Sequence, residues 1–283
     1  MKLQDLYFET KQELKAADKD SPDLAARRLI KQAAGLSDVQ FITEPEKAMS
    51  QAVIDTVKAM VERRLKGEPV SRILGEQEFW GLPFKVSEAV LDPRPDTETI
   101  IEATFQHFQD KPLRTILDLG TGSGCLIVTL LHEFPDSRGV AVDISESALA
   151  IARENADRNG VLDRCTFVKS DWDDSFTADL PSKYDLIVSN PPYIPNQDIA
   201  NLLDEVKKHD PSLALDGGND GLDAYKKIIP IINSHLNRDG ISLLEIGISQ
   251  EKDVTRIAAN AGLTPSRIHS DLGGIPRVVE ISK

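Results

Sequence analysis

Residues 116–124 of this 283-residue chain read Ile116-Leu117-Asp118-Leu119-Gly120-Thr121-Gly122-Ser123-Gly124. An apolar run of strand character leads into a glycine-rich turn, and a helical pattern follows over about 124–134. Glycine allows the backbone to turn tightly and to approach a ligand without side-chain obstruction. The spacing is not the Gly-x-Gly-x-x-Gly of dinucleotide-binding folds, which disfavours an NAD-dependent oxidoreductase. Alone, the turn is also compatible with an ordinary strand-to-helix connection.

The sequence on both sides of this turn alternates short apolar runs with helical stretches. Strands that alternate with helices favour an α/β fold with a doubly wound parallel sheet. Helices fit at about 124–134, 146–159, 221–236 and 250–261. Strands are predicted at residues 115–119, 139–143, 165–169, 185–189, 241–246 and 278–281.

The first part of the chain has a different pattern, which predicts a small helical bundle over residues 1–75. Apolar residues recur at helical spacing over 49–65, and Thr43-Glu44-Pro45-Glu46 resembles a capping box that would start this helix. An aromatic-rich run broken by glycine and proline predicts a hairpin or extended linker over residues 76–92. We therefore expect a helical domain over 1–75, this linker, and a sheet domain over 93–283.

The charges are divided unevenly along the chain. It holds 33 Lys+Arg and 46 Asp+Glu, which gives a net charge of −13. Residues 1–85 hold 14 of each, so residues 86–283 hold the other 19 basic and 32 acidic residues. Proteins that bind nucleic acid neutralise phosphates with Lys and Arg, so this balance argues against direct nucleic-acid binding and against an anionic membrane surface. The neutral helical part is the expected docking surface for a protein.

The remaining composition limits the class of protein further. Cys125 and Cys165 form neither a disulfide framework nor a paired-cysteine zinc site, and the 5 histidines lack metal-ligand spacing. The start of the chain has no continuous apolar segment, so we expect no signal peptide. No apolar run approaches the roughly 18 residues of a membrane span. These observations predict a cytoplasmic protein that holds no metal.

Asp143 ends the strand that follows the glycine turn, in the run Val140-Ala141-Val142-Asp143. A carboxylate about 20 residues beyond such a turn can accept hydrogen bonds from both hydroxyls of a ribose. It could instead cap the next helix, but Ser145 and Glu146 already supply a cap. Asp143 is therefore a candidate ligand of a ribose.

The most specific motif is Asn190-Pro191-Pro192-Tyr193, directly after a predicted strand. Ligands of open α/β sheets lie beyond the carboxyl ends of the strands. The prolines stiffen the turn and remove backbone donors, which leaves carbonyl oxygens as acceptors. Asn190 adds an amide, and Tyr193 adds a flat face. Together these groups suit a planar NH₂ group, although a rigid turn with Asn190 as a cap is the plain alternative.

These motifs carry a family resemblance. The glycine turn, the acidic strand end and Asn-Pro-Pro-Tyr resemble class I S-adenosylmethionine-dependent methyltransferases that modify a planar nitrogen. Further segments look like the HemK/PrmC family, the release factor glutamine methyltransferases, and the similarity covers nearly the whole chain. These segments are residues 74–81, 91–98, 209–215, 218–222 and 271–277.

The resemblance implies a set of cofactor-binding residues. The glycine loop would line the methionine part of S-adenosylmethionine, and Asp143 would hold its ribose. Asp171 and Trp172 would flank its adenine, although Trp172 could merely cover the surface. The loop residues concerned are Gly120, Thr121, Gly122, Ser123 and Gly124.

The resemblance also implies residues in a loop over the cofactor pocket and residues that face the substrate. Arg94 and Thr97 would close over the cofactor pocket, unless Arg94 pairs with Asp96 or Glu98. Asp92 stands where an apolar residue is expected, which puts the packing of this loop in doubt. The groups that would bind the substrate glutamine are Asn190, which would also touch the cofactor, and Pro191, Pro192 and Tyr193.

The implied reaction is transfer of a methyl group from S-adenosylmethionine to the N5 amide nitrogen of the glutamine in the Gly-Gly-Gln motif of peptide chain release factors. The partner would be a release factor, and we expect the enzyme to act as a monomer. An amide nitrogen is a poor nucleophile, so we predict that the Asn190 side-chain oxygen and the Pro191 carbonyl orient it while Tyr193 packs on the amide plane. Asn190, Pro191 and Tyr193 are therefore the predicted catalytic residues.

Other functions remain open at this stage. A nucleic-acid adenine-N6 methyltransferase would also suit Asn-Pro-Pro-Tyr, but the acidic sheet domain argues against it. A ribosomal-protein glutamine methyltransferase is separated less well. A non-catalytic binding module would not need Asn190 and Tyr193.

Overall fold

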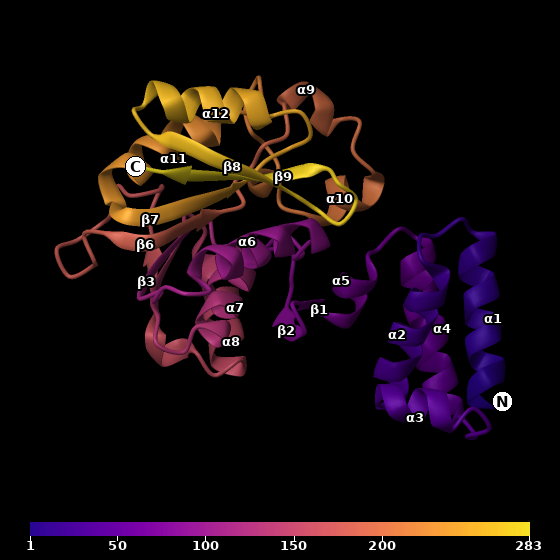
Figure 1. Ribbon diagram of the computed structural model, residues 1–283. Coiled ribbons are helices and arrows are strands. Elements are labelled where there is room, and N and C mark those ends of the chain that lie inside the picture. Colours follow the sequence, from indigo (N-terminus) through magenta and orange to yellow (C-terminus); the bar gives the residue numbers. More distant parts are fainter. The chain divides into compact units, whose positions relative to one another are not determined.

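The computed structural model describes residues 1–283 and separates them into two units (Figure 1). The first unit comprises Met1–Gly75 together with Asp204–His209. The second comprises Glu76–Leu203 and Asp210–Lys283. The association of the short segment Asp204–His209 with the helical unit is a feature that the sequence pattern did not indicate.

The first unit is a set of helices around one apolar core. α4 starts after Ser50, whose hydroxyl accepts a hydrogen bond from the Val53 N–H. The capping box predicted at Thr43 is wrong, because Thr43 ends α3 and the box is formed by Ser37 and Gln40. The helices of this unit are α1 (Leu3–Ala16), α2 (Pro22–Ala34), α3 (Asp38–Thr43), α4 (Gln51–Leu65), α5 (Val70–Leu74) and α10 (Asp204–His209).

A partly buried ion pair joins α10 to α4 within this unit. Arg64 of α4 is only 4% exposed, and its guanidinium donates to the Glu205 carboxylate of α10 at 2.6 Å. A buried charge is costly unless an opposite charge compensates it. The carboxylate that pairs with Arg64 therefore comes from a segment 141 positions further along the chain.

The second unit is built on a seven-stranded sheet in the order β5-β4-β3-β6-β7-β9-β8. The first five strands in this order are parallel, which confirms the predicted α/β class, whereas β9 is antiparallel to β7 and β8. The sequence pattern does not predict β8, because most of its residues are exposed. The strands are β3 (Thr115–Leu119), β4 (Arg138–Asp143), β5 (Cys165–Lys169), β6 (Tyr184–Ser189), β7 (Leu236–Glu245), β8 (Thr264–Ser270) and β9 (Pro276–Ser282).

Helices cover both faces of this sheet (Figure 1). One face carries α6, α7 and α8 and buries Ile116 and Leu186, whereas the other carries α11 and α12 and buries Leu117 and Ile187. No helix is long and apolar enough to span a membrane. The helices are α6 (Glu98–Phe108), α7 (Cys125–Glu133), α8 (Glu146–Arg158), α9 (Asn196–Ile199), α11 (Asp223–His235) and α12 (Glu251–Asn260), with short 3₁₀ turns η1 (Pro95–Thr97), η2 (Leu162–Arg164) and η3 (Ser212–Ala214).

A small hairpin precedes the sheet and braces the glycine turn. It consists of β1 (Glu76–Phe79) and β2 (Leu82–Lys85), which pair antiparallel. Asn155 of α8 is fully buried, and its side-chain oxygen accepts from the Lys85 N–H at 2.7 Å. Its amide nitrogen donates to the Ser123 carbonyl at 2.8 Å. One side chain thus ties the hairpin to the turn after β3.

The parallel strands place the motifs at one edge of the sheet. β3 ends before Gly120, β4 ends at Asp143, β6 ends before Asn190 and β7 ends at Glu245. The carboxyl ends of parallel strands lie at the same edge, which is where open α/β sheets bind ligands. The fold therefore brings together residues that are more than 120 positions apart in sequence.

Candidate active site

The glycine turn after β3 forms an open cradle. Gly120 and Gly122 have φ angles of +73° and +55°, which side-chain-bearing residues rarely adopt, and a Cβ at either position would point into empty space. Gly124 differs, because a Cβ there would lie 3.1 Å from Ala152 Cβ of α8. Two glycines therefore keep space open above the turn, and the third permits close packing below it.

Asp118 holds this turn from beneath. Its carboxylate is fully buried and accepts a hydrogen bond from the Thr121 hydroxyl at 2.6 Å. Burial raises the pKa of Asp118 to about 7, and the bond from Thr121 opposes that rise. Asp118 does not line the cavity, so its contact with Thr121 shapes the turn rather than the ligand surface.

Asp143 stands at the end of β4 beside the turn. Its carboxylate accepts from the backbone N–H groups of Gly122 and Ser145, each at 2.9 Å. Burial raises the pKa of Asp143, while these backbone bonds lower it. Ser145 caps α8, as expected, by accepting from the Ala148 N–H. Each carboxylate oxygen keeps acceptor capacity, because an ionised carboxylate offers about four lone-pair sites.

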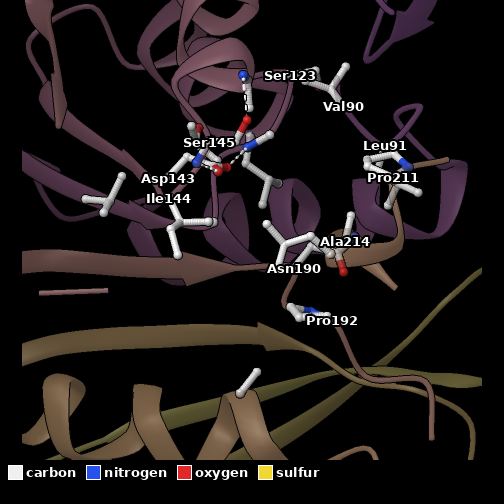
Figure 2. Close-up of a pocket in the computed structure, with 18 of the residues that line it drawn as sticks. Val90, Leu91, Ser123, Asp143, Ile144, Ser145, Asn190, Pro192, Pro211 and Ala214 are labelled. Atoms are coloured by element: carbon white, nitrogen blue, oxygen red, sulfur yellow. Dashed lines mark hydrogen bonds between the residues drawn. The ribbon is translucent and has the colours of Figure 1, made fainter. Parts of the chain in front are cut away.

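A cavity of about 440 Å³ joins these parts (Figure 2). Such a volume is typical of small-molecule sites. Figure 2 shows Asp143 and Ser145 on its wall, together with Asn190 and Pro192 from the loop after β6. The other predicted cofactor residues also line it, namely Gly120, Thr121, Gly122, Ser123, Asp171, Trp172, Arg94 and Thr97.

The cavity fits S-adenosylmethionine, the cofactor that the resemblance implies. A side chain at Gly120 or Gly122 would project into the open space above the turn. Without one, the turn exposes its backbone to a ligand. Asp143 presents acceptors for ribose hydroxyls, and Trp172 offers an aromatic surface beside it. Asp171 is exposed and lies 3.6 Å from the Lys227 ammonium. Gly124 supports the turn by packing rather than by lining the cavity.

The loop after β6 presents Asn190 in one orientation. Its amide nitrogen donates to the Thr97 hydroxyl oxygen at 3.0 Å, so its side-chain oxygen remains as an acceptor. Pro192 also lines the cavity, whereas Pro191 is buried and neither Pro191 nor Tyr193 lies on the cavity wall. Tyr193 instead directs its hydroxyl toward the Glu245 carboxylate at 3.5 Å.

Glycines from a later segment crowd against this loop and hold it. A Cβ added to Gly217 would lie 2.8 Å from the Cα of Tyr193, and one added to Gly221 would meet the Tyr193 carbonyl oxygen. The Gln250 amide donates to the same carbonyl at 2.9 Å. The Ile194 N–H donates to the Leu215 carbonyl at 3.0 Å. The segment around 215–221 is therefore a support that the sequence motif alone did not explain.

Two ion pairs hold the loop that carries Arg94 and Thr97. The Arg94 guanidinium donates to Asp210 at 2.6 Å, so the predicted alternative pairing with Asp96 or Glu98 is wrong. Asp210 is only 3% exposed, and this pairing brings a second distant segment to the cavity.

Asp96 pairs instead with Arg277 at 2.7 Å. Arg277 is 14% exposed and also contacts Asp271 at 2.8 Å. Asp271 additionally accepts from the N–H groups of Gly273 and Ile275. The segment 271–277 is thus a folded clamp on the 3₁₀ turn η1.

Comparison with known proteins identifies the family. Residues 5–75 match the model of the PrmC N-terminal domain, and residues 97–217 match that of the methyltransferase small domain. The release factor glutamine methyltransferase of Bradyrhizobium diazoefficiens is 43% identical over 274 residues, which cover 95% of this chain and 91% of that protein. The chain belongs to the release factor glutamine methyltransferase family. The release factor glutamine methyltransferase of Caulobacter vibrioides is 40% identical to this chain. The matched residues cover 95% of this chain and 92% of that protein.

Solved structures agree with the fold of this family member. The hMettl16 catalytic domain in complex with MAT2A 3′UTR hairpin 6 aligns with a TM-score of 0.55 at 17% identity, over 72% of this chain and 76% of that one. At this identity the likeness supports the methyltransferase fold alone. Family membership also excludes the NAD-dependent oxidoreductase considered from the glycine turn.

Sequence reasoning missed several residues of this family member's site. Glu245, Gln250, Asp210 and Arg277 all contact the loops that carry the predicted site residues. Glu245 had a signal, because it is the one charged residue in the apolar run 241–246. Asp210 and Arg277 lie in two of the segments that carry the family resemblance, but nothing in the sequence indicated their partners, and Gln250 had no signal.

Proposed function

We propose that this protein transfers a methyl group from S-adenosylmethionine to the side-chain amide nitrogen of the glutamine in the Gly-Gly-Gln motif of peptide chain release factors. The observation that carries the proposal is one cavity that holds both the Asp143 carboxylate and the Asn190 amide. The names of the relatives and the PrmC N-terminal domain support the choice of a release factor as the substrate.

Asn190 and Pro191 would orient the substrate nitrogen. The Asn190 amide nitrogen is engaged by Thr97, so its oxygen is available to accept one N–H of the substrate amide. The Pro191 carbonyl is the predicted acceptor of the other, although Pro191 itself is buried and does not line the cavity. A bound S-adenosylmethionine supplies an electrophilic methyl group on a sulfonium. Orientation of this kind can lower the barrier by several kcal/mol. The nitrogen needs no strong base beforehand, because its proton becomes acidic once the methyl group is attached.

The remaining site roles stay predictions. Tyr193 packing on the amide plane is one, and its position off the cavity wall makes a supporting role the simpler one. Recognition of the release factor by residues 1–75 is another. That the enzyme acts as a monomer in the cytoplasm, without nucleic acid, is a third.

The test uses labelled S-adenosylmethionine and the purified full-length protein. A release factor is offered beside a version with the tripeptide glutamine replaced by alanine, and ribosomal proteins and adenine-containing RNA and DNA are offered separately. We expect label on the unaltered release factor alone. Equal labelling of both release factors would overturn the proposal, and preferential labelling of ribosomal protein or nucleic acid would support one of the alternatives.

A further inference from the structure

Glu245 is a buried acid beside the predicted substrate-binding loop. It ends β7 and is 2% exposed. β7 pairs in parallel with β6 so that Leu244 stands opposite Ser189. One residue further on, Glu245 and Asn190 leave the sheet side by side, and Glu245 therefore lies under the loop that presents the Asn190 amide.

Two hydroxyl groups converge on this carboxylate. The Tyr193 hydroxyl lies 3.5 Å from one carboxylate oxygen, and the Thr97 hydroxyl is close enough to lower the pKa of the same group. The Asn190 amide nitrogen donates to that Thr97 hydroxyl. The other Glu245 oxygen is buried and accepts no hydrogen bond. Thr97 therefore connects Asn190, which donates to its hydroxyl, with Glu245, whose charged form it favours.

The direction of the hydrogen bonds among Asn190, Thr97 and Glu245 has a chemical consequence. A hydroxyl carries one hydrogen, and an ionised carboxylate can only accept. When Thr97 gives its hydrogen to Glu245, its oxygen can only accept from Asn190. Asn190 must then turn its NH₂ group toward Thr97 and its oxygen away, toward the cavity.

We infer that Glu245 is a positioning residue that fixes the Asn190 amide, through Thr97, with its oxygen facing the substrate. The inference rests on the proposed function and adds a residue to it. Glu245 does not touch the substrate, since it does not line the cavity. A fully buried carboxylate is costly, and an apolar side chain would pack at this position at lower cost. Its acceptor-only chemistry supplies a reason for its presence.

The charge state of Glu245 connects this arrangement to pH. Burial raises the pKa of Glu245 to about 7, and the bonds from Thr97 and Tyr193 oppose the rise. Above this value the ionised group orients Thr97 as described. Below it the protonated carboxyl can donate its hydrogen to Thr97. The direction of the hydrogen bonds among Asn190, Thr97 and Glu245 is then reversed. The other groups facing Glu245 are Asp96 of η1, Arg277 of β9, Tyr193, Tyr225 of α11 and Cys125 of α7.

The two tyrosines and the thiol do not titrate in the same range. Burial raises the pKa of Tyr193 and of Tyr225, and it raises that of Cys125 to about 12, so all three stay neutral. Asp96 and Arg277 form an ion pair with each other. Asp118 beneath the glycine turn also has a pKa of about 7, so a rate that rises through about pH 7 in the wild type is assigned to Glu245 by its disappearance in Glu245→Gln.

The experiment compares Glu245→Gln with Glu280→Gln in the full-length protein. Glu280 is a matched control, because it is a 12% exposed acid of the neighbouring strand β9 that contacts His269 and lies outside the cavity. We expect Glu245→Gln to lower kcat about 10- to 100-fold, with affinity for S-adenosylmethionine within about twofold of the wild type. The rise in rate near pH 7 should disappear in Glu245→Gln and persist in Glu280→Gln.

A second pair of variants tests the path through Thr97. Thr97→Ser keeps the hydroxyl and should retain most activity, whereas Thr97→Val removes it and should match Glu245→Gln. The double variant Thr97→Val/Glu245→Gln should be no worse than either single variant, since both interrupt that path. Additive losses would overturn the inference, and so would an unchanged pH profile in Glu245→Gln. The Thr97 pair gives this answer even where Glu245→Gln does not fold.

A readout that is independent of methyl transfer separates this inference from the proposed function. In ¹⁵N-labelled protein, the Asn190 side-chain NH₂ signal should shift with a midpoint near the pKa of Glu245, about 7, and should lose that shift in Glu245→Gln. A wild-type protein that leaves release factors unmethylated but shows this shift would reject the proposed function alone. A signal that ignores pH in the wild type would reject the inference.

Discussion

The loop 120–124 and the loop 190–193 both follow strands of one sheet, yet they are held in different ways. The first is held almost entirely by its sequence neighbourhood, through Asp118, Asp143 and the helix that follows each strand. The second is held by Thr97, by the segment 215–221, and by the end of β7. The cofactor side of the cavity is therefore a local construction, and the substrate side depends on distant parts of the chain.

This difference suggests a division of consequences. A change on the cofactor side should alter cofactor affinity, because its groups are predicted to contact the ligand directly. A change on the substrate side should alter the rate of methyl transfer while cofactor affinity is retained. The following predictions test that separation.

The largest effect is expected from Asn190→Ala. Loss of the amide oxygen leaves the substrate nitrogen without one of its two orienting acceptors, so methyl transfer should fall by about 100-fold or more. Affinity for S-adenosylmethionine, measured by calorimetry, should change little. An equal loss of cofactor affinity would contradict the role given to Asn190.

Asp143→Ala should show the opposite pattern. Removing the carboxylate deletes the predicted ribose acceptors and frees the backbone N–H groups of Gly122 and Ser145. We expect cofactor affinity to fall about 10- to 100-fold by calorimetry, with a smaller change in kcat at saturating cofactor. Asp136→Ala is the matched control, because the Asp136 side chain is 83% exposed and outside the cavity. Unchanged affinity in Asp143→Ala would remove Asp143 from the cofactor site.

Gly217→Ala should affect the substrate side through packing alone. Its Cβ would lie 2.8 Å from Tyr193 Cα, so the loop 190–193 must shift. We expect kcat to fall about tenfold, with cofactor affinity retained. Gly139→Ala is the control, because a Cβ there would clash with the Ile127 side chain, away from this loop. Both variants should lose thermal stability, and a similar loss of kcat in both would show that the effect is not local.

The smallest effect on methyl transfer is expected at Asp118, where the change concerns the pH dependence of stability. The pKa of Asp118 is about 7 in the folded protein against an ordinary value of 3.8, so the folded state binds the proton more tightly than the unfolded state. Its contribution to stability is therefore present at low pH and is lost as pH rises from about 4 to 7.

Asp118→Asn should reduce this pH dependence by an amount on the order of 4 kcal/mol, measured by urea unfolding at several pH values. The side-chain oxygen of the substituted amide can still accept from Thr121, so the turn should persist. Asp136→Asn, an exposed control, should leave the dependence unchanged. An unaltered slope in Asp118→Asn would contradict the raised pKa.

Much of the fold followed from periodicity. The strands β3, β5 and β6 and the helices α7, α8, α11 and α12 lie where alternating apolar runs and helical patterns placed them. β8 was not predicted, because an exposed edge strand has no alternating apolar pattern from a buried face. β7 begins at Leu236, before the predicted start, because the polar residues near its beginning carry no apolar signal.

The glycine turn, Asp143 and Asn190 were identifiable from the sequence because each depends on residue type and on position at a strand end, which are local properties. Their partners were not identifiable in that way. Glu205 for Arg64, Asp210 for Arg94 and Glu245 for Tyr193 are contacts between residues 141, 116 and 52 positions apart. Only the packed sheet and its loops bring such residues together. A buried charge or hydroxyl is costly without a partner, and that partner can come from any part of the chain that packs beside it.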